Sequence, residues 1–169
     1  MAVRTITVVV DNREKRPIRF PEYIRRCGDL LKIKTAERHL RTGDYRLDNK
    51  GFLKALIERK GRETELYDCT LGRRHKQFRA QLERLSRESD RPVLLLDTTP
   101  YLVEMYDYTK YNSRAPKNAG ELVIQNLVDL CMEYNVNLIW FGRMDSPMRE
   151  HCAGRLVLYL LTTKIPQAA

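Results

Sequence analysis

Short apolar runs constrain the fold of this 169-residue chain more than any other feature of its sequence. They are Thr5 to Val10 (TITVVV), Pro92 to Asp97 (PVLLLD) and Val136 to Phe141 (VNLIWF). Runs of four to eight apolar, often β-branched residues are typical of strands buried inside a sheet. We therefore expect each run to be a strand, with the rest of the chain arranged around a common sheet.

The segments between these runs alternate between strand and helix patterns. The clearest helix covers Gly72 to Arg87, because Phe78, Leu82 and Leu85 fall on one face of it. We also expect helices over 21–27, 98–108, 117–134 and 146–163, and strands over 31–35, 45–47 and 52–60, the last two forming a hairpin through the turn at 48–51. Early strands followed by alternating helices and strands predict an α/β fold, a mixed sheet flanked by helices, in a single domain of residues 1–169.

The charge balance favours a polyanionic partner. The chain has 31 Lys and Arg against 22 Asp and Glu, a net charge of +9, and nucleic acid is the commonest partner for such an excess. Within Gly72 to Arg87, Glu83 opposes six cations, so we predict that this helix binds DNA phosphates. The alternative is the solvated outer face of an ordinary helix. The six cations are Arg73, Arg74, Lys76, Arg79, Arg84 and Arg87.

Several classes of protein are excluded or disfavoured. The apolar run from Leu156 to Leu161 is far shorter than the roughly 20 residues that cross a bilayer, and the N-terminus lacks the pattern of a signal peptide. We expect no membrane association and a cytoplasmic, nucleoid-associated location, or a nuclear one in a eukaryote. The cysteines show no metal-binding or disulfide pattern, so we expect reduced, mostly buried thiols. They are Cys27, Cys69, Cys131 and Cys152.

Candidate catalytic residues gather around the predicted hairpin. Alternation along a strand turns Glu58 and Lys60 to one face and Arg59 to the other. Asp44 begins the first strand of the hairpin and can lie beside the end of the second, while Asp11 ends the neighbouring strand. Two carboxylates could hold Mg²⁺ and a nearby lysine could stabilise charge on a phosphate, as phosphodiester hydrolysis requires. The same pattern also fits a solvated strand edge.

Three short motifs resemble those of the XPF-type structure-specific endonucleases. They are Val10-Asp11-Asn12-Arg13-Glu14, then Gly43-Asp44-Tyr45, and then Ile57-Glu58-Arg59-Lys60. The resemblance implies a restriction-endonuclease-like fold that cleaves DNA at junctions between duplex and single strand with Mg²⁺ or Mn²⁺. It implies further that Asp44 and Glu58 are the principal metal ligands, that Asp11 is a third acidic ligand, and that Lys60 is the catalytic lysine. Arg13, Glu14 and Arg59 would support them.

The chain departs from this family pattern at two places. Thr64 stands where the family has an acid, with Glu65 next to it, and we interpret Thr64 as a helix cap. The helix–hairpin–helix repeats that often follow the nuclease domain are absent from this sequence, so a partner subunit could supply them. The last helix carries more apolar residues than one face needs, which predicts either a buried position or a homodimer or heterodimer through this helix.

The function we predict is that of a metal-dependent endonuclease acting on branched, flapped or forked DNA. One alternative is a non-catalytic DNA-binding or dimer-partner domain of the same fold, and another is a four-way-junction resolvase. Tyr106, Tyr108 and Tyr111 could stack on unpaired bases, or they could pack on one another within their own connector.

Overall fold

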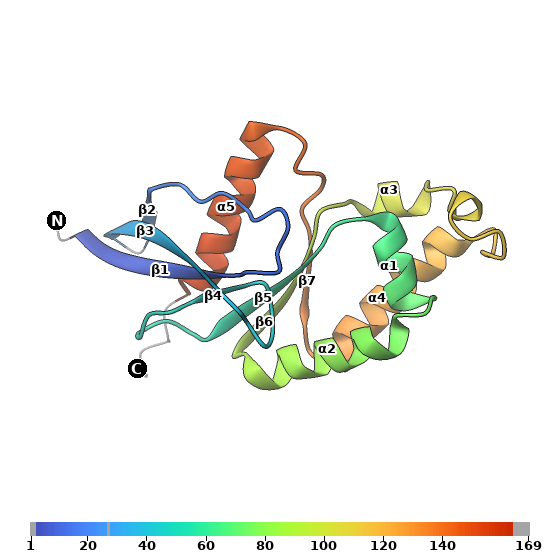
Figure 1. The fold of residues 1–169 in the computed structure, drawn as a ribbon, viewed down its shortest axis with the longest axis horizontal. Helices are drawn as coiled ribbons and strands as arrows, with labels where there is room; N and C mark the ends of the chain where they lie inside the picture. The colour runs from blue at the N-terminus through green and yellow to red at the C-terminus, as the bar shows by residue number, and fades with distance from the viewer. Residues whose placement is uncertain (1–2, 27, 164–169) are drawn as a thin grey trace.

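The computed structural model describes residues 3–26 and 28–163. Along this part of the chain, strands come first and helices then alternate with strands (Figure 1). The elements are β1 (Val3–Asp11), β2 (Tyr23–Arg26), β3 (Asp29–Arg38), β4 (Tyr45–Leu47), β5 (Ala55–Lys60), α1 (Glu63–Thr70), α2 (His75–Glu88), β6 (Arg91–Leu96), α3 (Pro100–Glu104), the 3₁₀ helix η1 (Tyr108–Lys110), α4 (Ala119–Glu133), β7 (Asn137–Trp140) and α5 (Pro147–Leu161).

The described strands form one sheet in the order β2-β3-β1-β4-β5-β6-β7. β1 is parallel to β3, and β5, β6 and β7 are parallel to one another. β4 is antiparallel to both β1 and β5, so it joins the two parallel parts and closes the predicted hairpin with β5. A mixed sheet flanked by helices is therefore confirmed, and the three apolar runs are β1, β6 and β7.

Helices cover the two faces of the sheet unequally. α5 packs on one face through residues such as Val157 and Leu158, and the core beneath it reaches from β2 and β3 across to β6. α1, α2 and α4 pack on the other face, where their core includes Leu56 of β5 and Leu94 of β6. Figure 1 shows these three helices together at one end of the molecule, away from β2 and β3. We call the first cluster the α5 core and the second the three-helix core.

The prediction of a helix over residues 21–27 is wrong. Residues Tyr23–Arg26 form the edge strand β2, antiparallel to β3, with Ile24 buried and its neighbours Tyr23 and Arg25 exposed. Gly28 has a φ of +82°, which allows the sharp turn from β2 into β3. A four-residue segment shows barely one period of either pattern, so periodicity cannot distinguish a strand from a helix here. Cys27, the last residue of the expected helix, lies outside the described residues.

The apolar character of the last helix is explained by packing within this chain. Six residues of α5 are buried, and they belong to the α5 core or adjoin it. This supports the buried position that we weighed against a subunit interface. A homodimer or heterodimer through α5 stays a prediction.

Two exclusions made from the sequence can be compared with the structure. No helix within residues 3–26 and 28–163 is both long and apolar enough to cross a membrane. Cys69 and Cys131 are buried free thiols and Cys152 is an exposed one, while Cys27 lies outside the described residues. The thiols that the structure describes are thus unpaired, as expected.

Candidate active site

Asp44 is positioned by the glycine that precedes it. Gly43 has a φ of +75°, and a Cβ at this position would lie 3.2 Å from the carbonyl oxygen of Ile57. The Asp44 backbone N–H donates to that same carbonyl over 2.7 Å. The Asp44 carboxylate accepts a hydrogen bond from the backbone N–H of Arg59 at 2.8 Å. Only glycine fits so close to β5 in this conformation, which explains why the Gly-Asp pair places a carboxylate beside the end of β5.

Glu58 and Lys60 project from the same face of β5 and form a buried ion pair. Both residues are buried, and the Lys60 Nζ lies 2.7 Å from a Glu58 carboxylate oxygen. The Glu65 carboxylate is 3.6 Å from the same Nζ. Burial alone would lower the pKa of Lys60, but the charges of Glu58 and Glu65 outweigh it and raise this pKa above its ordinary value. Lys60 therefore stays charged at physiological pH.

The Asp44 and Glu58 carboxyl groups lie close enough to repel each other. Burial raises the pKa of Asp44, and the negative charge of Glu58 raises it further, to about 7. The hydrogen bond from the Arg59 backbone and the charge of Lys60 act in the opposite direction. Two carboxylates that are held close together despite their mutual repulsion form an oxygen-donor pair that a divalent cation stabilises.

Asp11 is buried in a separate pairing. Its carboxylate binds the guanidinium of Arg13, with a shortest distance of 2.6 Å, and also accepts from the backbone N–H of Leu40 at 3.3 Å. The hydrogen bond from Arg13 is the main reason that the pKa of Asp11 is lowered. Across residues 3–26 and 28–163, no three His, Cys, Asp or Glu side chains are grouped so that they could hold a metal ion. The structure thus brings Asp44 and Glu58 together, but not Asp11 with them.

Arg59 turns to the opposite face of β5, as strand alternation predicts. Its guanidinium pairs with the Asp97 carboxylate and lies 3.6 Å from that of Glu14. Burial would lower the pKa of Arg59, but the hydrogen bond and charge of Asp97 outweigh it and raise this pKa. Asp97 was missed as a site residue in the sequence. Its position directly after the apolar strand β6 was the available signal, because that end of β6 lies beside the end of β5.

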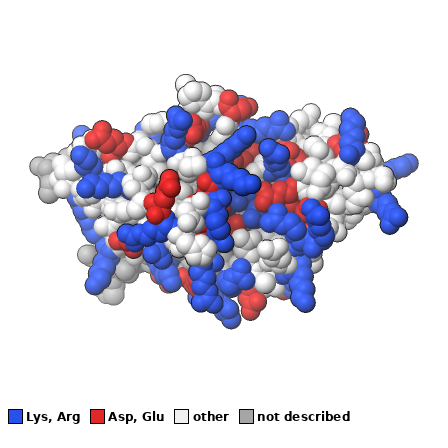
Figure 2. Space-filling view, viewed as in Figure 1, with Lys and Arg blue, Asp and Glu red and all other residues white. Residues whose placement is uncertain are grey.

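A cleft of roughly 1720 Å³ opens over these groups. Asp44, Glu58 and Lys60 lie in its wall, and the rest of the wall is rich in arginine. In the view of Figure 2, Lys and Arg side chains gather around the middle of the molecule and enclose acidic side chains. The arginines that line the cleft are Arg13, Arg16, Arg19, Arg41, Arg59, Arg62, Arg74, Arg84 and Arg143. An acidic centre within a basic wall can accept a phosphodiester while leaving room for a cation.

Comparison with known proteins identifies the family. The family model described as "ERCC4 domain" matches residues 10–147, which is most of the chain. The chain belongs to the ERCC4 domain family. The resemblance to XPF-type nucleases is confirmed, and so is the α/β fold class. A search of the curated proteins found no match.

Two solved structures share the fold of this ERCC4 domain. XPF from Aeropyrum pernix has a TM-score of 0.55 at 14% identity, over 96% of this chain and 66% of that one. XPF from Aeropyrum pernix in complex with DNA has a TM-score of 0.54 at 19% identity, over 93% of this chain and 63% of that one. The ERCC4 domain described here therefore spans about two thirds of the length of either protein.

The six cations predicted to bind DNA do not share one surface of the ERCC4 domain. Arg74 and Arg84 line the cleft, together with Gln77 and Gln81 from the same side of α2. Arg79 instead pairs with Glu133 of α4.

The remaining cations of this set point elsewhere. Arg73 pairs with Asp68 at 3.7 Å, Arg87 pairs with Glu83 at 3.9 Å, and Lys76 is exposed. Acids from neighbouring elements thus balance part of the charge of this helix, and DNA binding by the six residues stays a prediction.

The interpretation of Thr64 as a helix cap is wrong. α1 starts at Glu63 with Arg62 at the cap position, so Thr64 lies within the first turn. Glu65, one residue further along, carries the acid that faces Lys60 at 3.6 Å, and its carboxylate also lies 3.7 Å from Arg74. In this ERCC4 domain, therefore, the acid that reaches Lys60 stands one position beyond Thr64.

The tyrosines of the connector pack on one another. The ring of Tyr108 stacks on Tyr67 at 5.2 Å between centroids and meets Tyr106 at 4.8 Å. The hydroxyl of Tyr111 donates to Asp68 at 2.8 Å. This supports internal packing over the alternative of stacking on unpaired bases.

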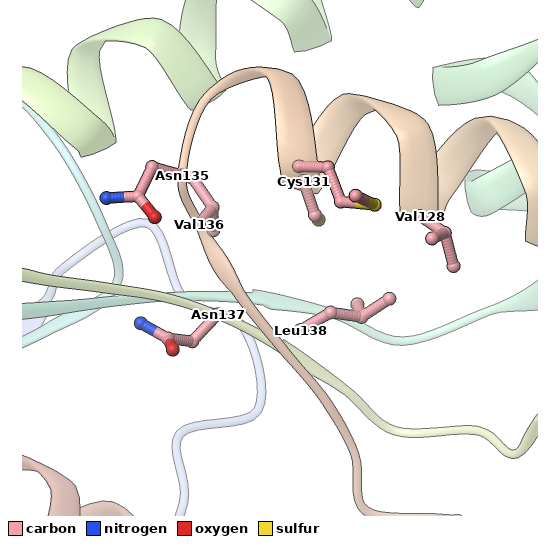
Figure 3. A pocket seen from close by; sticks show the side chains of 7 residues that line it. Val128, Cys131, Asn135, Val136, Asn137 and Leu138 are labelled. Atoms are coloured by element: carbon pink, nitrogen blue, oxygen red, sulfur yellow. The ribbon is translucent and has the colours of Figure 1, made fainter.

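A second hollow lies apart from the acidic centre. It measures roughly 280 Å³ and is formed where α4 passes into β7, with Cys131, Val136 and Leu138 among its lining residues (Figure 3). Figure 3 shows the amide side chains of Asn135 and Asn137 at one end of it. None of the candidate catalytic residues lines this hollow.

Proposed function

We propose that this ERCC4 domain is an endonuclease that hydrolyses phosphodiester bonds of DNA at flaps, forks or other junctions with the aid of Mg²⁺ or Mn²⁺. The observation that carries the proposal is the meeting of the Asp44 and Glu58 carboxyl groups beside Lys60 in an arginine-lined cleft. Family membership supports nuclease chemistry. The structure of XPF from Aeropyrum pernix in complex with DNA, which has a similar fold, supports DNA as the ligand.

The donor set of the site fits a hard divalent cation. Mg²⁺ binds proteins through one or two carboxylates and takes its remaining ligands from water and phosphate, so Asp44 and Glu58 suffice. Binding of a cation between them would relieve the repulsion that raises the pKa of Asp44 to about 7. When bound, such an ion polarises a phosphate and lowers the pKa of a water molecule. Asp11 would enter this set only if its pairing with Arg13 opened.

The chain's own residues supply position and positive charge. Lys60 is held at 2.7 Å from Glu58, where its ammonium can stabilise the negative charge that develops on a phosphate during attack. The backbone of Arg59 fixes the Asp44 carboxylate, and the Arg59 side chain secures β5 from the other face through Asp97 and Glu14. Arg59 therefore acts as a positioning residue, and Arg74 and Arg84 can hold the flanking phosphates.

A cleavage assay tests the proposal. Labelled 3′-flap, fork and four-way DNA substrates are incubated with the purified chain in Mg²⁺, in Mn²⁺ and in EDTA. Cleavage should require the metal and should fall by at least about a hundredfold in Asp44→Asn. Asp129→Asn, which removes a carboxylate from the exposed surface of α4, is the matched control and should cleave like wild type.

The substrates and the metal also separate the alternatives. A preference for the four-way substrate would indicate a resolvase instead. Absence of cleavage on every substrate, together with no effect of Mn²⁺ on stability, would indicate a DNA-binding domain without catalysis. Activity of Asp44→Asn equal to that of wild type would contradict the proposed mechanism.

A further inference from the structure

One half of the sheet has a face that no described helix covers. The three-helix core contains Leu56, Leu94 and Leu96 of β5 and β6, but its described members include no residue of β1, β2, β3 or β4. On β1, Ile6, Val8 and Val10 face the α5 core, so Thr5, Thr7 and Val9 face the other way. Along this side Thr5 is exposed, Thr7 is half-buried and Val9 is buried. Figure 1 shows that α1, α2 and α4 lie toward the opposite end of the molecule.

This open face carries a row of cations. Strand register places Lys32 and Lys34 opposite Thr5 and Thr7, and Arg46 opposite Val9, so their side chains share the open side. The same alternation adds Arg38 from β3 and Arg25 from β2. We call this set of five, Arg25, Lys32, Lys34, Arg38 and Arg46, the sheet platform.

Acids neutralise only part of this charge. Glu22 lies 3.7 Å from Lys32, and Asp48 contacts both Arg38 at 2.8 Å and Arg46 at 3.7 Å. Lys34 is exposed and forms no ion pair with any residue that the structure describes. The platform therefore keeps a surplus of positive charge in the open, where a polyanion can reach it.

The sheet platform leads away from the active site on the same side of the sheet. Glu58 and Lys60 project to the side of the three-helix core, as Leu56 does. Arg38 pairs in register with Asp11, next to the Asp44 backbone. Lys34 follows four residues before it on β3, and Lys32 two residues further on. From Arg38 to Lys32 the strand rises about 20 Å. That length matches roughly six base pairs of duplex DNA.

We infer that the sheet platform binds the phosphate backbone of a duplex arm of the DNA substrate. This deepens the proposed function, on which it rests for the identity of the substrate. Platforms for single strands need several aromatic rings for base stacking. Here the aromatic side chain Tyr23 lies under the Lys32 ammonium at 5.6 Å. Cations spread over a sheet can bind the regularly spaced phosphates of a duplex without any stacking on bases.

Binding of a fluorescent blunt duplex tests this inference. The platform variant is Lys32→Gln with Lys34→Gln, and the control is Lys110→Gln with Lys117→Gln. Both variants remove two positive charges, from half-buried Lys32 and exposed Lys34 in one and from exposed Lys110 and Lys117 in the other. Lys110 and Lys117 belong to the connector region at the far end of the molecule (Figure 1). Because each lost phosphate contact lowers the salt slope by about 0.9, the platform variant should show a slope smaller by about 1.8.

The affinity change should follow from that slope. Between about 50 and 200 mM salt, the difference in affinity between wild type and the platform variant should shrink by about tenfold. The control should match wild type at each salt concentration. A platform variant that binds the duplex like the control would overturn the inference while leaving cleavage at the active site intact.

Two further outcomes are distinguishable in the same samples. Wild type that binds the duplex through the platform yet cleaves nothing with Mg²⁺ or Mn²⁺ would contradict the proposed function and support this inference. Light scattering on the same proteins reports the oligomeric state. If the platform variant changes that state but not its duplex affinity, the face is covered by a second copy and the inference is wrong.

Discussion

Replacing Asp44 by asparagine is expected to stabilise the metal-free protein at alkaline pH. In the folded state the pKa of Asp44 is raised from 3.8 to about 7, first by burial and then by the charge of Glu58. A carboxyl group whose folded pKa is raised binds its proton more tightly in the folded state. It contributes stability that is fully present below pH 3.8 and is lost as the pH rises toward 7.

The size of the effect follows from this shift. A pKa change of roughly three units corresponds to about 4 kcal/mol, since each unit is worth about 1.4 kcal/mol. Asparagine has no charge to bury, so we expect Asp44→Asn to gain about 2–4 kcal/mol at pH 8 in EDTA. At pH 5 Asp44 is still mostly protonated in the folded wild type, so it carries little buried charge there. The free energy of unfolding gained by Asp44→Asn should therefore be about 1–3 kcal/mol smaller at pH 5 than at pH 8.

Urea denaturation at pH 5 and pH 8, with and without Mg²⁺, provides the measurement. Asparagine keeps an oxygen that can accept from the Arg59 backbone, so the variant should fold. Mg²⁺ should stabilise wild type and leave Asp44→Asn unchanged, and the exposed Asp129→Asn should behave as wild type at both pH values. Loss of stability at pH 8, or a gain that does not depend on pH, would refute the reasoning.

Three other substitutions probe the surroundings of the site. Lys60→Met leaves the Glu58 carboxylate buried without its cation, so unfolding should become easier by about 3 kcal/mol and cleavage should fall at least a hundredfold, measured by denaturation and a flap assay. Gly43→Ala combines a strained φ with a contact of 3.2 Å to the backbone of β5, and should cost about 2 kcal/mol more than Gly28→Ala, which has similar φ but open space. Phe78→Ala removes a buried ring beneath α2 and should lower the free energy of unfolding by about 3–5 kcal/mol.

The sequence predicted those parts of the fold that depend on local patterns. β6 from Pro92 to Leu96 and the end of β1 from Val8 to Val10 are apolar and buried, and such runs are recognisable without tertiary information. The pairing of Glu58 with Lys60 on one face, and of Arg59 on the other, follows from strand alternation alone. The expectation that Asp44 lies beside the end of β5 followed from the predicted hairpin, and the Arg59 backbone N–H donates to its carboxylate there.

The features that could not be predicted depend on contacts between distant segments. Nothing local to Asp11 shows that Arg13 will occupy its carboxylate, because the pairing depends on the loop that carries Leu40. The acids that partner Arg73 and Arg79 come from α1 and α4, so composition along α2 overstated its free charge. The short strand β2 is stabilised by pairing with β3, which a local reading cannot show.

Because β5 carries paired charged residues on both faces, folding depends strongly on the register of β5 against β4. A slip of one residue in the register of β5 would turn Glu58 and Lys60 toward the α5 core and Arg59 toward the three-helix core. Charged side chains would then meet apolar surroundings on both faces of the strand. Misaligned forms should therefore be penalised heavily during folding. Length changes in this region should be tolerated in the turn around Asn49 and Lys50, and should abolish folding when a single residue is added between Ala55 and Lys60.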